Sequence, residues 1–247
     1  MVVPVPYCGT PPSPATLLFR FNLDPVLIAA LIGAAILHIY LMRRRSSRFT
    51  AVAGWTVTAA ALISPLCALS VSLFSGRIGQ HMVLILCAAP LLALSTPQVS
   101  IRWARRGLWL STLSFLIALW FWHMPVPYDA TFESTATYWA MHLTLFGSAV
   151  ALWRALLCSP RQTGGDVLLA GVLTSMQMGF LGAILTTAGR PLYFHHLATT
   201  QPWGLTPLQD QALGGILMWV PGILLFLWAS VHALARLRSL AERTSPV

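Results

Sequence analysis

Charged residues are scarce in this sequence, and lysine is absent altogether. Only 9% of the 247 residues are charged, whereas about a quarter are charged in a typical soluble domain. Hydrophobic residues make up 57% of the chain, and the mean hydropathy is +0.73. This composition excludes a soluble globular domain, which needs a charged surface, and a disordered chain, which has little hydrophobic content.

Cysteine is also scarce, and no two cysteines have CxxC spacing. The four are Cys8, Cys67, Cys87 and Cys158. Their number and spacing indicate neither a disulfide framework nor a zinc knuckle. The sequence likewise lacks a P-loop, GxGxxG, GxSxG and HExxH, and its carboxylates are too few and too scattered for a hydrolytic pair. We therefore expect no enzymatic activity.

Long apolar runs are what the sequence does contain. A bilayer core needs about 20 mostly apolar residues per helix. Seven runs meet this need, at about 25–42, 50–73, 78–96, 107–123, 137–157, 167–188 and 209–235. The prediction is an all-α, polytopic membrane protein with seven transmembrane helices. It divides into a segment outside the membrane (1–24), one membrane domain (25–235) and a cytoplasmic tail (236–247).

The arginines predict how these runs are oriented, because short cytoplasmic loops hold an excess of positive charge. Twelve of the 15 flank the inner ends of alternate runs: Arg43, Arg44, Arg45, Arg48, Arg102, Arg105, Arg106, Arg154, Arg161, Arg236, Arg238 and Arg243. The opposite side has only Arg20, Arg77 and Arg190, together with Asp24, Asp129, Glu133 and Asp210. We therefore expect the N-terminus outside and the C-terminus in the cytoplasm. The first 16 residues lack the charged and apolar regions of a cleaved signal peptide.

The net charge of +9 has other interpretations. In a soluble protein it would suggest nucleic acid binding, and basic tracts beside a span can attract anionic lipid head groups. Topology alone, however, predicts the alternation of arginine from loop to loop. We expect the lipid bilayer as the surroundings of the chain and no nucleic acid as a partner.

Histidine is concentrated toward the predicted outer face. Ionisable side chains within spans cost about 2.5–3.5 kcal/mol at the bilayer centre, so each one needs a reason. Five of the seven histidines lie at or near the outer ends of the runs: His81, His123, His142, His195 and His196. His38 and His232 lie toward the inner ends. Histidine at a membrane interface often simply reaches water or a backbone carbonyl, so this asymmetry permits a metal site without requiring one.

Methionine follows the same asymmetry. Met82, Met124 and Met141 adjoin three of the outer histidines, while Met176, Met178 and Met218 come from the last two runs. Imidazole and thioether ligands together suit copper, and thioether favours Cu(I). Methionine is also an ordinary packing residue, and neighbours such as His81 and Met82 point about 100° apart on a helix. An outer copper site and simple packing therefore both stay open.

The start of the last run is the best-specified element. Thr206 to Gln209 match a capping box, with Thr206 as the N-cap, Pro207 in the first helical position and Gln209 returning to the cap amide. Asp210 then lies in the first turn, where a carboxylate favours the positive end of the helix dipole. It also shares a face with Gly214 and Met218, so a role beside a metal is the alternative. Gly214 and Gly215 permit close helix approach, and Pro90 and Pro221 predict kinks.

Several motifs in this order give the chain a family resemblance over about residues 77–228. They are Gln80-His81-Met82 with Ala89-Pro90-Leu91-Leu92 and Pro97; Trp122-His123-Met124-Pro125 with Tyr128-Asp129; His142 with Phe146 and Trp153; Leu181-Gly182 with Arg190-Pro191-Leu192-Tyr193; and Trp203-Gly204-Leu205-Thr206, Asp210-Gln211, Gly214-Gly215, Met218-Trp219 and Pro221-Gly222. The chain resembles the CtaG family of assembly factors for caa3-type cytochrome c oxidase. The last block, LxDQxxGGxxMW, is the most specific.

The resemblance implies a chaperone-like, multi-pass protein of the bacterial cytoplasmic (inner) membrane, with oxidase subunits and copper ion as partners. One departure bears on copper. In the family pattern a further histidine commonly stands four residues before His81 and before His142, whereas this chain has Arg77 and Tyr138 there. A histidine pair at i and i+4 can chelate one metal, so any site here must instead be assembled between helices.

Three hypotheses follow from the sequence. In the first, the chain binds Cu(I) at the outer membrane level through His81, His142 and His123, with Met82, Met141 and Met218 as softer ligands and Asp210 tuning the site. The second is a metal-free scaffold for oxidase assembly, and the third is a small transporter or a b-type haem protein. Imidazoles of His81 and His142 closer than about 5 Å would favour a shared metal, and a separation beyond about 8 Å would favour the scaffold.

Overall fold

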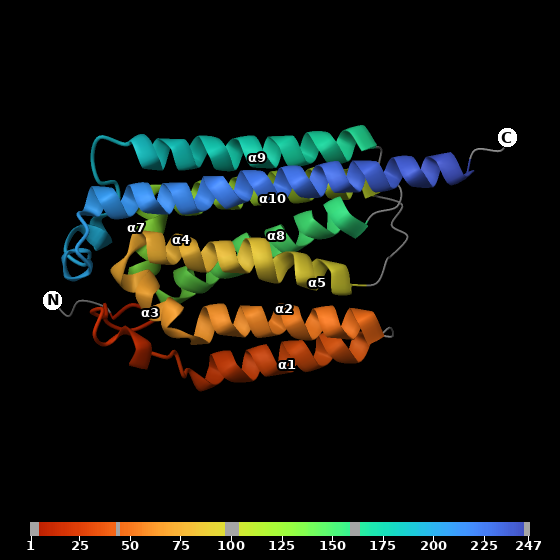
Figure 1. Ribbon diagram of the computed structural model, residues 1–247. Helices are drawn as coiled ribbons and strands as arrows, with labels where there is room; N and C mark the ends of the chain where they lie inside the picture. Colours follow the sequence, from red (N-terminus) through yellow and green to blue (C-terminus); the bar gives the residue numbers. More distant parts are fainter. Residues whose placement is uncertain (1–4, 43–44, 97–103, 159–163, 245–247) are drawn as a thin grey trace.

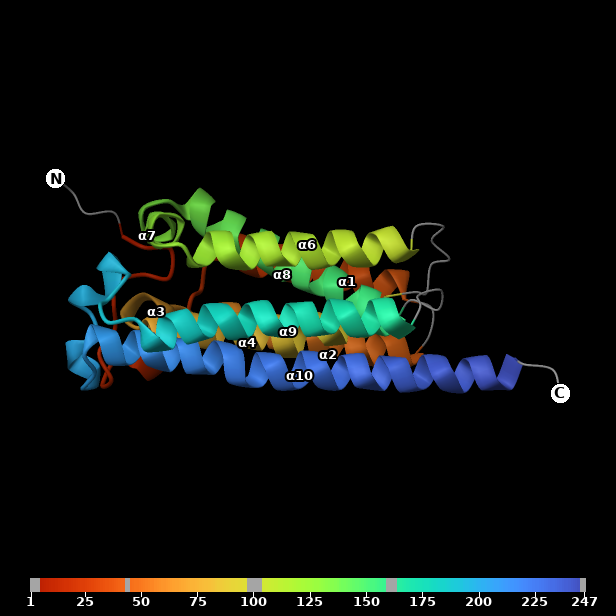
Figure 2. The same cartoon turned by 90° about the horizontal axis from the view of Figure 1, so that it is seen from above.

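The computed structural model describes residues 5–42, 45–96, 104–158 and 164–244, and this part of the chain is helical without strands. Its α-helices are α1 (Pro25–Leu41), α2 (Arg45–Ile63), α3 (Pro65–Ser72), α4 (Phe74–Met82), α5 (Ala89–Ser95), α6 (Ala104–His123), α7 (Pro125–Glu133), α8 (Thr135–Cys158), α9 (Gly164–Thr187) and α10 (Pro207–Thr244). Short helices are η1 (Leu17–Phe19), η2 (Val83–Ala88), η3 (Phe194–Leu197) and η4 (Gln201–Trp203). The long helices lie side by side in one elongated bundle (Figure 1; Figure 2).

Every predicted apolar run coincides with a helix or a group of consecutive helices, which confirms the all-helical class. By length and composition, four helices in the described ranges are able to cross a membrane: Phe74–Ser95, Thr135–Cys158, Gly164–Thr187 and Pro207–Ala235. The count rises to six if each of two bent helix pairs is one span. Helix α1 is apolar but has only 17 residues. The prediction of seven spans is thus supported in part.

The two bent pairs were not predicted from the hydrophobic pattern. Helices α2 and α3 meet at 47°, and α6 and α7 meet at 74°. A proline opens the second helix of each pair, and proline cannot continue the hydrogen bonding of the helix before it. Pro65 follows Ser64, whose side chain accepts a hydrogen bond from the Leu66 amide, and Pro125 follows His123 and Met124. The predicted run 50–73 merges α2 and α3, because proline interrupts the helix without ending the apolar stretch. The predicted run 107–123 ends with α6, and α7 lies in what was predicted to be a loop.

Pro90 also marks an irregularity, as expected. It lies at the start of α5, directly after the π-helical segment η2, and α4, η2 and α5 together form the continuous helix Phe74–Ser95. Proline lacks the amide that would continue the ladder, and π-bulges absorb such breaks. Pro221 instead lies within α10, which runs through it without ending.

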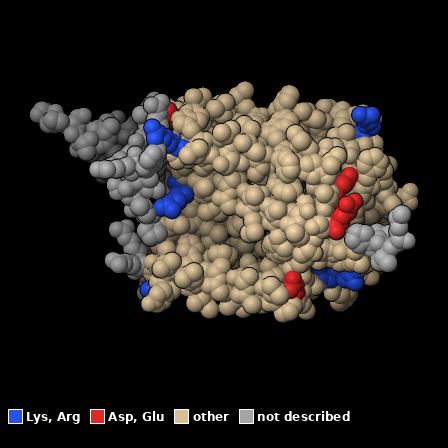
Figure 3. Space-filling model, turned by 180° about the vertical axis from the view of Figure 1, so that it is seen from behind, with Lys and Arg blue, Asp and Glu red and all other residues tan. Residues whose placement is uncertain are grey.

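Charged groups lie mainly toward the two ends of the bundle, with a broad uncharged belt between them (Figure 3). Arg48 and Arg106 lie in the first turns of α2 and α6, and Arg154 lies near the end of α8. Figures 1 and 2 show these helix ends at the end of the bundle where the C-terminus lies. The other arginines predicted for this side lie outside the described residues or have side chains that are not described. The loop before α10, α7 and the N-terminal segment lie at the opposite end (Figure 1).

A disulfide joins the N-terminal segment to α3, contrary to the sequence prediction of no disulfide framework. Cys8 and Cys67 are bonded, with their Cα atoms 5.5 Å apart and a sequence separation of 59. Both sulfurs approach the Tyr138 hydroxyl, at 3.4 and 3.8 Å. Spacing rules did not find this pair because it links a terminal segment to a helix rather than two neighbouring cysteines.

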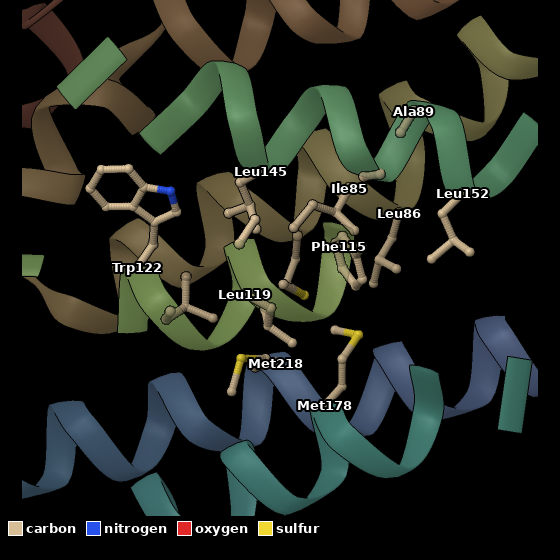
Figure 4. Packing of buried hydrophobic residues seen from close by; sticks show 14 of the residues in the cluster. Ile85, Leu86, Ala89, Phe115, Leu119, Trp122, Leu145, Leu152, Met178 and Met218 are labelled. Carbon is tan, nitrogen blue, oxygen red and sulfur yellow. The ribbon is translucent and has the colours of Figure 1, made fainter. Parts of the chain in front are cut away.

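The main apolar core lies between α4, α6, α8, α9 and α10 (Figure 4). Glycines bring α9 and α10 into close contact: a Cβ at Gly215 would lie 2.7 Å from the Gly182 carbonyl oxygen, and one at Gly182 would lie 2.6 Å from the Trp219 Cβ. The predicted capping box also forms, because the Thr206 amide donates to Gln209 Oε1 and the Gln209 amide donates to Thr206 Oγ1.

Candidate metal-binding histidine cluster

Three buried histidines from three different helices meet inside the bundle. His81 lies near the end of α4, His123 ends α6 and His142 lies in α8; they are 2%, 4% and 4% exposed. The ring centroids of His81 and His142 are 5.4 Å apart, and those of His81 and His123 are 6.0 Å apart. The structure therefore brings the three strongest sequence candidates together, with His81 between the other two.

Backbone contacts define the tautomers of His123 and His142. Nδ1 of His123 lies 2.6 Å from the Leu119 carbonyl oxygen, and Nδ1 of His142 lies 3.0 Å from the Tyr138 carbonyl oxygen. A carbonyl oxygen only accepts hydrogen bonds, so each Nδ1 carries the proton and donates. A neutral ring then has a lone pair on Nε2, which is the arrangement that histidine adopts when Nε2 binds a metal.

The remaining ring nitrogens of the cluster have no hydrogen-bond partner among the described residues. They are Nε2 of His123, Nε2 of His142 and both nitrogens of His81. Buried polar atoms in proteins are nearly always paired, and an unpaired one calls for an explanation such as a bound ion or water. The chemistry of these donors, neutral imidazoles with available lone pairs, fits a soft or borderline metal ion.

The cluster is not a finished metal site in the arrangement described. No three His, Cys, Asp or Glu side chains of the described ranges are grouped closely enough to hold a metal ion. The 5.4 Å between His81 and His142 falls between the limits of about 5 Å and about 8 Å set for a shared metal and for a scaffold. Ligands at about 2 Å from one ion would require at least one ring to turn.

Arg77 and Tyr138 lie one helical turn before His81 and His142, respectively. The Arg77 guanidinium lies 5.7 Å from the centre of the Tyr138 ring, whose centroid is in turn 4.2 Å from that of His142. The two positions at which the chain departs from the family's histidine pairs are therefore neighbours in space. Together they form a second layer beside the three histidines, toward the start of α4 and α8.

The methionines proposed as softer ligands lie in the main apolar core. Met82, Met141 and Met218 are 7%, 0% and 0% exposed and belong to the same hydrophobic cluster as Met178. Figure 4 shows Met178 and Met218 among leucine, isoleucine and phenylalanine side chains. Packing accounts for these positions without a metal, and a ligand role for the three methionines stays a prediction.

Asp210 lies in the first turn of α10, as predicted, but its carboxylate has a further structural role that was not predicted. Its carboxylate accepts hydrogen bonds from the amides of Phe74 and Ser75, at 2.6 and 3.0 Å, and from the Ser75 hydroxyl. Leu73, the N-cap residue of α4, supplies no side-chain hydrogen bond. Asp210 of α10 therefore caps α4 from a different helix, and a tuning effect on a metal stays a prediction.

The protein-family model described as cytochrome c oxidase caa3 assembly factor (Caa3_CtaG) matches residues 36–239. The chain belongs to this family. The match includes every candidate ligand named above as well as Arg77, Tyr138 and Asp210. No curated protein and no solved structure matches the chain.

Two further histidines of this assembly factor join the loop before α10 to the end of α3 by hydrogen bonds. Nε2 of His195 lies 3.1 Å from the Val71 carbonyl oxygen, and Nδ1 of His196 lies 3.3 Å from that of Ser72. Helices leave their last carbonyl groups without partners in the helix, and these rings satisfy two of them. Both histidines were predicted near the outer face from the sequence, but no role was predicted for them.

The positions of two residues near the cluster were not predicted from the sequence. Arg77 was assigned to the outer side but not to the interior, where it is 1% exposed. Tyr7 was not considered; its ring packs on Tyr138 with centroids 4.8 Å apart, and its hydroxyl donates to Asp24. The burial of Arg77 beside the cluster was predictable from its position four residues before His81. No pattern in the sequence indicated the position of Tyr7.

Proposed function

We propose that this caa3 assembly factor takes up Cu(I) at His81, His123 and His142 and passes it to an oxidase subunit at the outer face of the membrane. One observation carries the proposal: three buried imidazoles from three helices lie together with Nε2 atoms that have no partner among the described residues. Imidazole is a good copper ligand. The arginine distribution and the predicted orientation support the outer face.

A site of this kind is suited to the transfer of Cu(I) to a partner. Neutral ligands drawn from separate helices bind an ion without a carboxylate or thiolate to hold it electrostatically. Because a ring must turn before all three nitrogens reach one ion, part of the binding free energy is spent on rearrangement. Both effects weaken binding and make release to a partner easier.

The direct test is Cu(I) binding by purified protein in detergent, measured in competition with a chromogenic Cu(I) chelator. We expect about one Cu(I) per wild-type chain and a large loss of affinity in His81→Ala/His142→Ala. His232→Ala is the matched control, because His232 is exposed and stacks on Trp228. If the wild type and the double variant both bind no Cu(I), the copper role is wrong.

A metal-free scaffold is the second candidate, favoured by the absence of a ready three-ligand group in the described ranges. The two functions predict different results in cells. A copper donor requires the histidines, so His81→Ala/His142→Ala should lower assembled oxidase as much as deletion of the gene. A scaffold requires the helix surfaces, so the same variant should leave assembly intact.

The haem alternative receives no support from the histidine geometry. Two axial imidazoles need the iron and the porphyrin plane between them, whereas the His81 and His142 rings are in edge-to-face contact at 5.4 Å. A Soret band in the absorption spectrum of the purified protein would contradict this conclusion.

A further inference from the structure

Arg77 is a buried cation that forms no salt bridge in the described part of the chain; the Asp129 carboxylate interacts with it electrostatically without contact. It is 1% exposed, and its guanidinium contacts the Thr131 hydroxyl and lies 3.9 Å from the centre of the Phe132 ring and 5.3 Å from that of Tyr128. Its Nε has no partner. Aromatic faces stabilise a cation but do not neutralise it, and Asp129 forms no ion pair with the guanidinium, so a positive charge remains in the interior.

This charge lies beside the histidine cluster. Residues at i and i+4 share one helix face, so Arg77 and His81 are neighbours along α4. The guanidinium also lies over Tyr138, which contacts His142 in α8. Arg77 interacts electrostatically with both His81 and His142. The guanidinium would therefore repel a cation bound by the histidines, because the protein interior screens charges poorly.

We propose that Arg77 makes the histidine cluster selective for a monovalent cation, Cu(I), over divalent ions such as Zn²⁺. The inference rests on the proposed copper function and adds the property that determines which ion binds. Arginine stays protonated in proteins, so its repulsion is permanent and is twice as large for a divalent ion. The three imidazoles are neutral ligands and do not offset that repulsion.

The size of the effect follows from Coulomb's law. For unit charges about 8 Å apart at an effective dielectric constant near 20, each additional charge on the ion lowers its affinity roughly tenfold or more. Imidazole sites without such a charge commonly accept zinc. The guanidinium therefore replaces ligand type as the source of selectivity in a site that contains only nitrogen donors.

The test compares Cu(I) and Zn²⁺ affinities in purified full-length variants. Arg77→Met keeps the length and apolar packing of the side chain but removes the charge, and Arg77→Lys keeps the charge. We expect the ratio of Cu(I) to Zn²⁺ affinity to fall roughly tenfold or more in Arg77→Met and to stay near the wild-type value in Arg77→Lys. Arg190→Gln, at an exposed arginine, is the control for loss of one positive charge.

The outcomes separate this inference from the function on which it rests. An unchanged ratio in Arg77→Met with intact Cu(I) binding overturns the selectivity role alone. An equal loss in Arg77→Met and Arg77→Lys also overturns it, because shape rather than charge would be responsible. A wild-type protein that binds no Cu(I) overturns the copper function itself. If Arg77→Met does not fold, Arg77→Gln gives the same comparison.

Discussion

At the scale of residues, hydrogen bonding separates the histidines of this chain into two groups. His38 accepts from the Trp55 indole at 3.0 Å and contacts the Ser95 hydroxyl at 3.2 Å, so both of its nitrogens are satisfied. His196 likewise uses both nitrogens, toward Ser72 and the Tyr128 hydroxyl. His81, His123 and His142 instead retain unpaired nitrogens at one place. This contrast distinguishes a candidate ligand cluster from histidines that serve the fold.

Replacing Asp210 should destabilise the fold without affecting copper. In Asp210→Asn, the hydrogen bonds to Phe74 and Ser75 lose their charged acceptor, which typically costs about 1.5–3 kcal/mol. We expect a lower Tm in detergent and an unchanged Cu(I) affinity per folded chain. Glu133→Gln, at an exposed position, serves as the control. A selective loss of Cu(I) affinity with an unchanged Tm would instead support the tuning role of Asp210.

His195 should make stability depend on pH. Burial, together with the charge of Arg77, lowers the pKa of His195 to about 4 from its ordinary value of 6.5. The unfolded chain therefore binds the proton more tightly, so the contribution of His195 is complete above about pH 6.5 and is lost as the pH falls toward 4.

The measurement is Tm against pH for the wild type and His195→Gln. Between pH 7 and 4.5 the Tm of the wild type should fall further than that of His195→Gln. The Tm of His232→Gln should fall as far as that of the wild type. Parallel curves for the wild type and His195→Gln would exclude this contribution. His196, whose pKa is also lowered by burial and by its charged neighbours, acts in the same direction and remains in both proteins.

At the scale of elements, the contact between α9 and α10 depends on glycine. A side chain at Gly215 would meet backbone atoms of α9, namely the Gly182 carbonyl oxygen at 2.7 Å and the Thr186 amide at 2.9 Å. Backbone cannot move aside as a side chain can. We expect Gly215→Ala to lower stability by about 1–3 kcal/mol, the usual effect of overpacking.

Thermal unfolding in detergent measures this effect, with Gly33→Ala as the control. Gly33 lies in α1, and a Cβ there would have no neighbour within 4 Å. The control should be neutral or slightly stabilising, since alanine favours helix. Equal Tm values for the two variants would show that the helices adjust at Gly215.

Local sequence rules predicted some elements better than others. The start of α10 was predicted in detail because Thr206 and Gln209 act within one helical turn, and the helical runs follow from hydropathy. The bend after Ile63 was missed because it depends on a proline within the apolar run 50–73. Helix α7 was missed because it lies between two predicted runs, in a segment that was predicted to be a loop. Convergence of His81, His123 and His142 was expected only as a shared membrane level, since contact between them depends on how three helices pack.

At the scale of the whole molecule, the disulfide gives a test of orientation. Cys8 and Cys67 lie at the end of the bundle predicted to face outward, and disulfides persist in oxidising compartments. Alkylation of the denatured, unreduced protein should therefore modify two of its four cysteines, Cys87 and Cys158. Modification of all four would contradict an outward location of this end.

Loss of the disulfide should also destabilise this end of the bundle. Cross-links of this kind typically contribute about 2–4 kcal/mol, so Cys8→Ser should lower the Tm as much as reduction of the wild type does. Cys87→Ser, at an exposed free cysteine, should retain the wild-type Tm. A Tm that is insensitive to reductant would show that the other contacts of the N-terminal segment, such as Tyr7 on Tyr138 and the Ser72 hydroxyl on the Pro12 carbonyl, are sufficient to hold it.

The central claim is that His81, His123 and His142 together bind Cu(I). X-ray absorption of the Cu(I)-loaded protein tests it most directly, because it reports the atoms bound to the ion. We expect two or three nitrogen neighbours at about 2 Å with the multiple scattering of imidazole rings, and their loss in His81→Ala/His142→Ala. A spectrum without imidazole scattering, or one unchanged in the double variant, would contradict the claim.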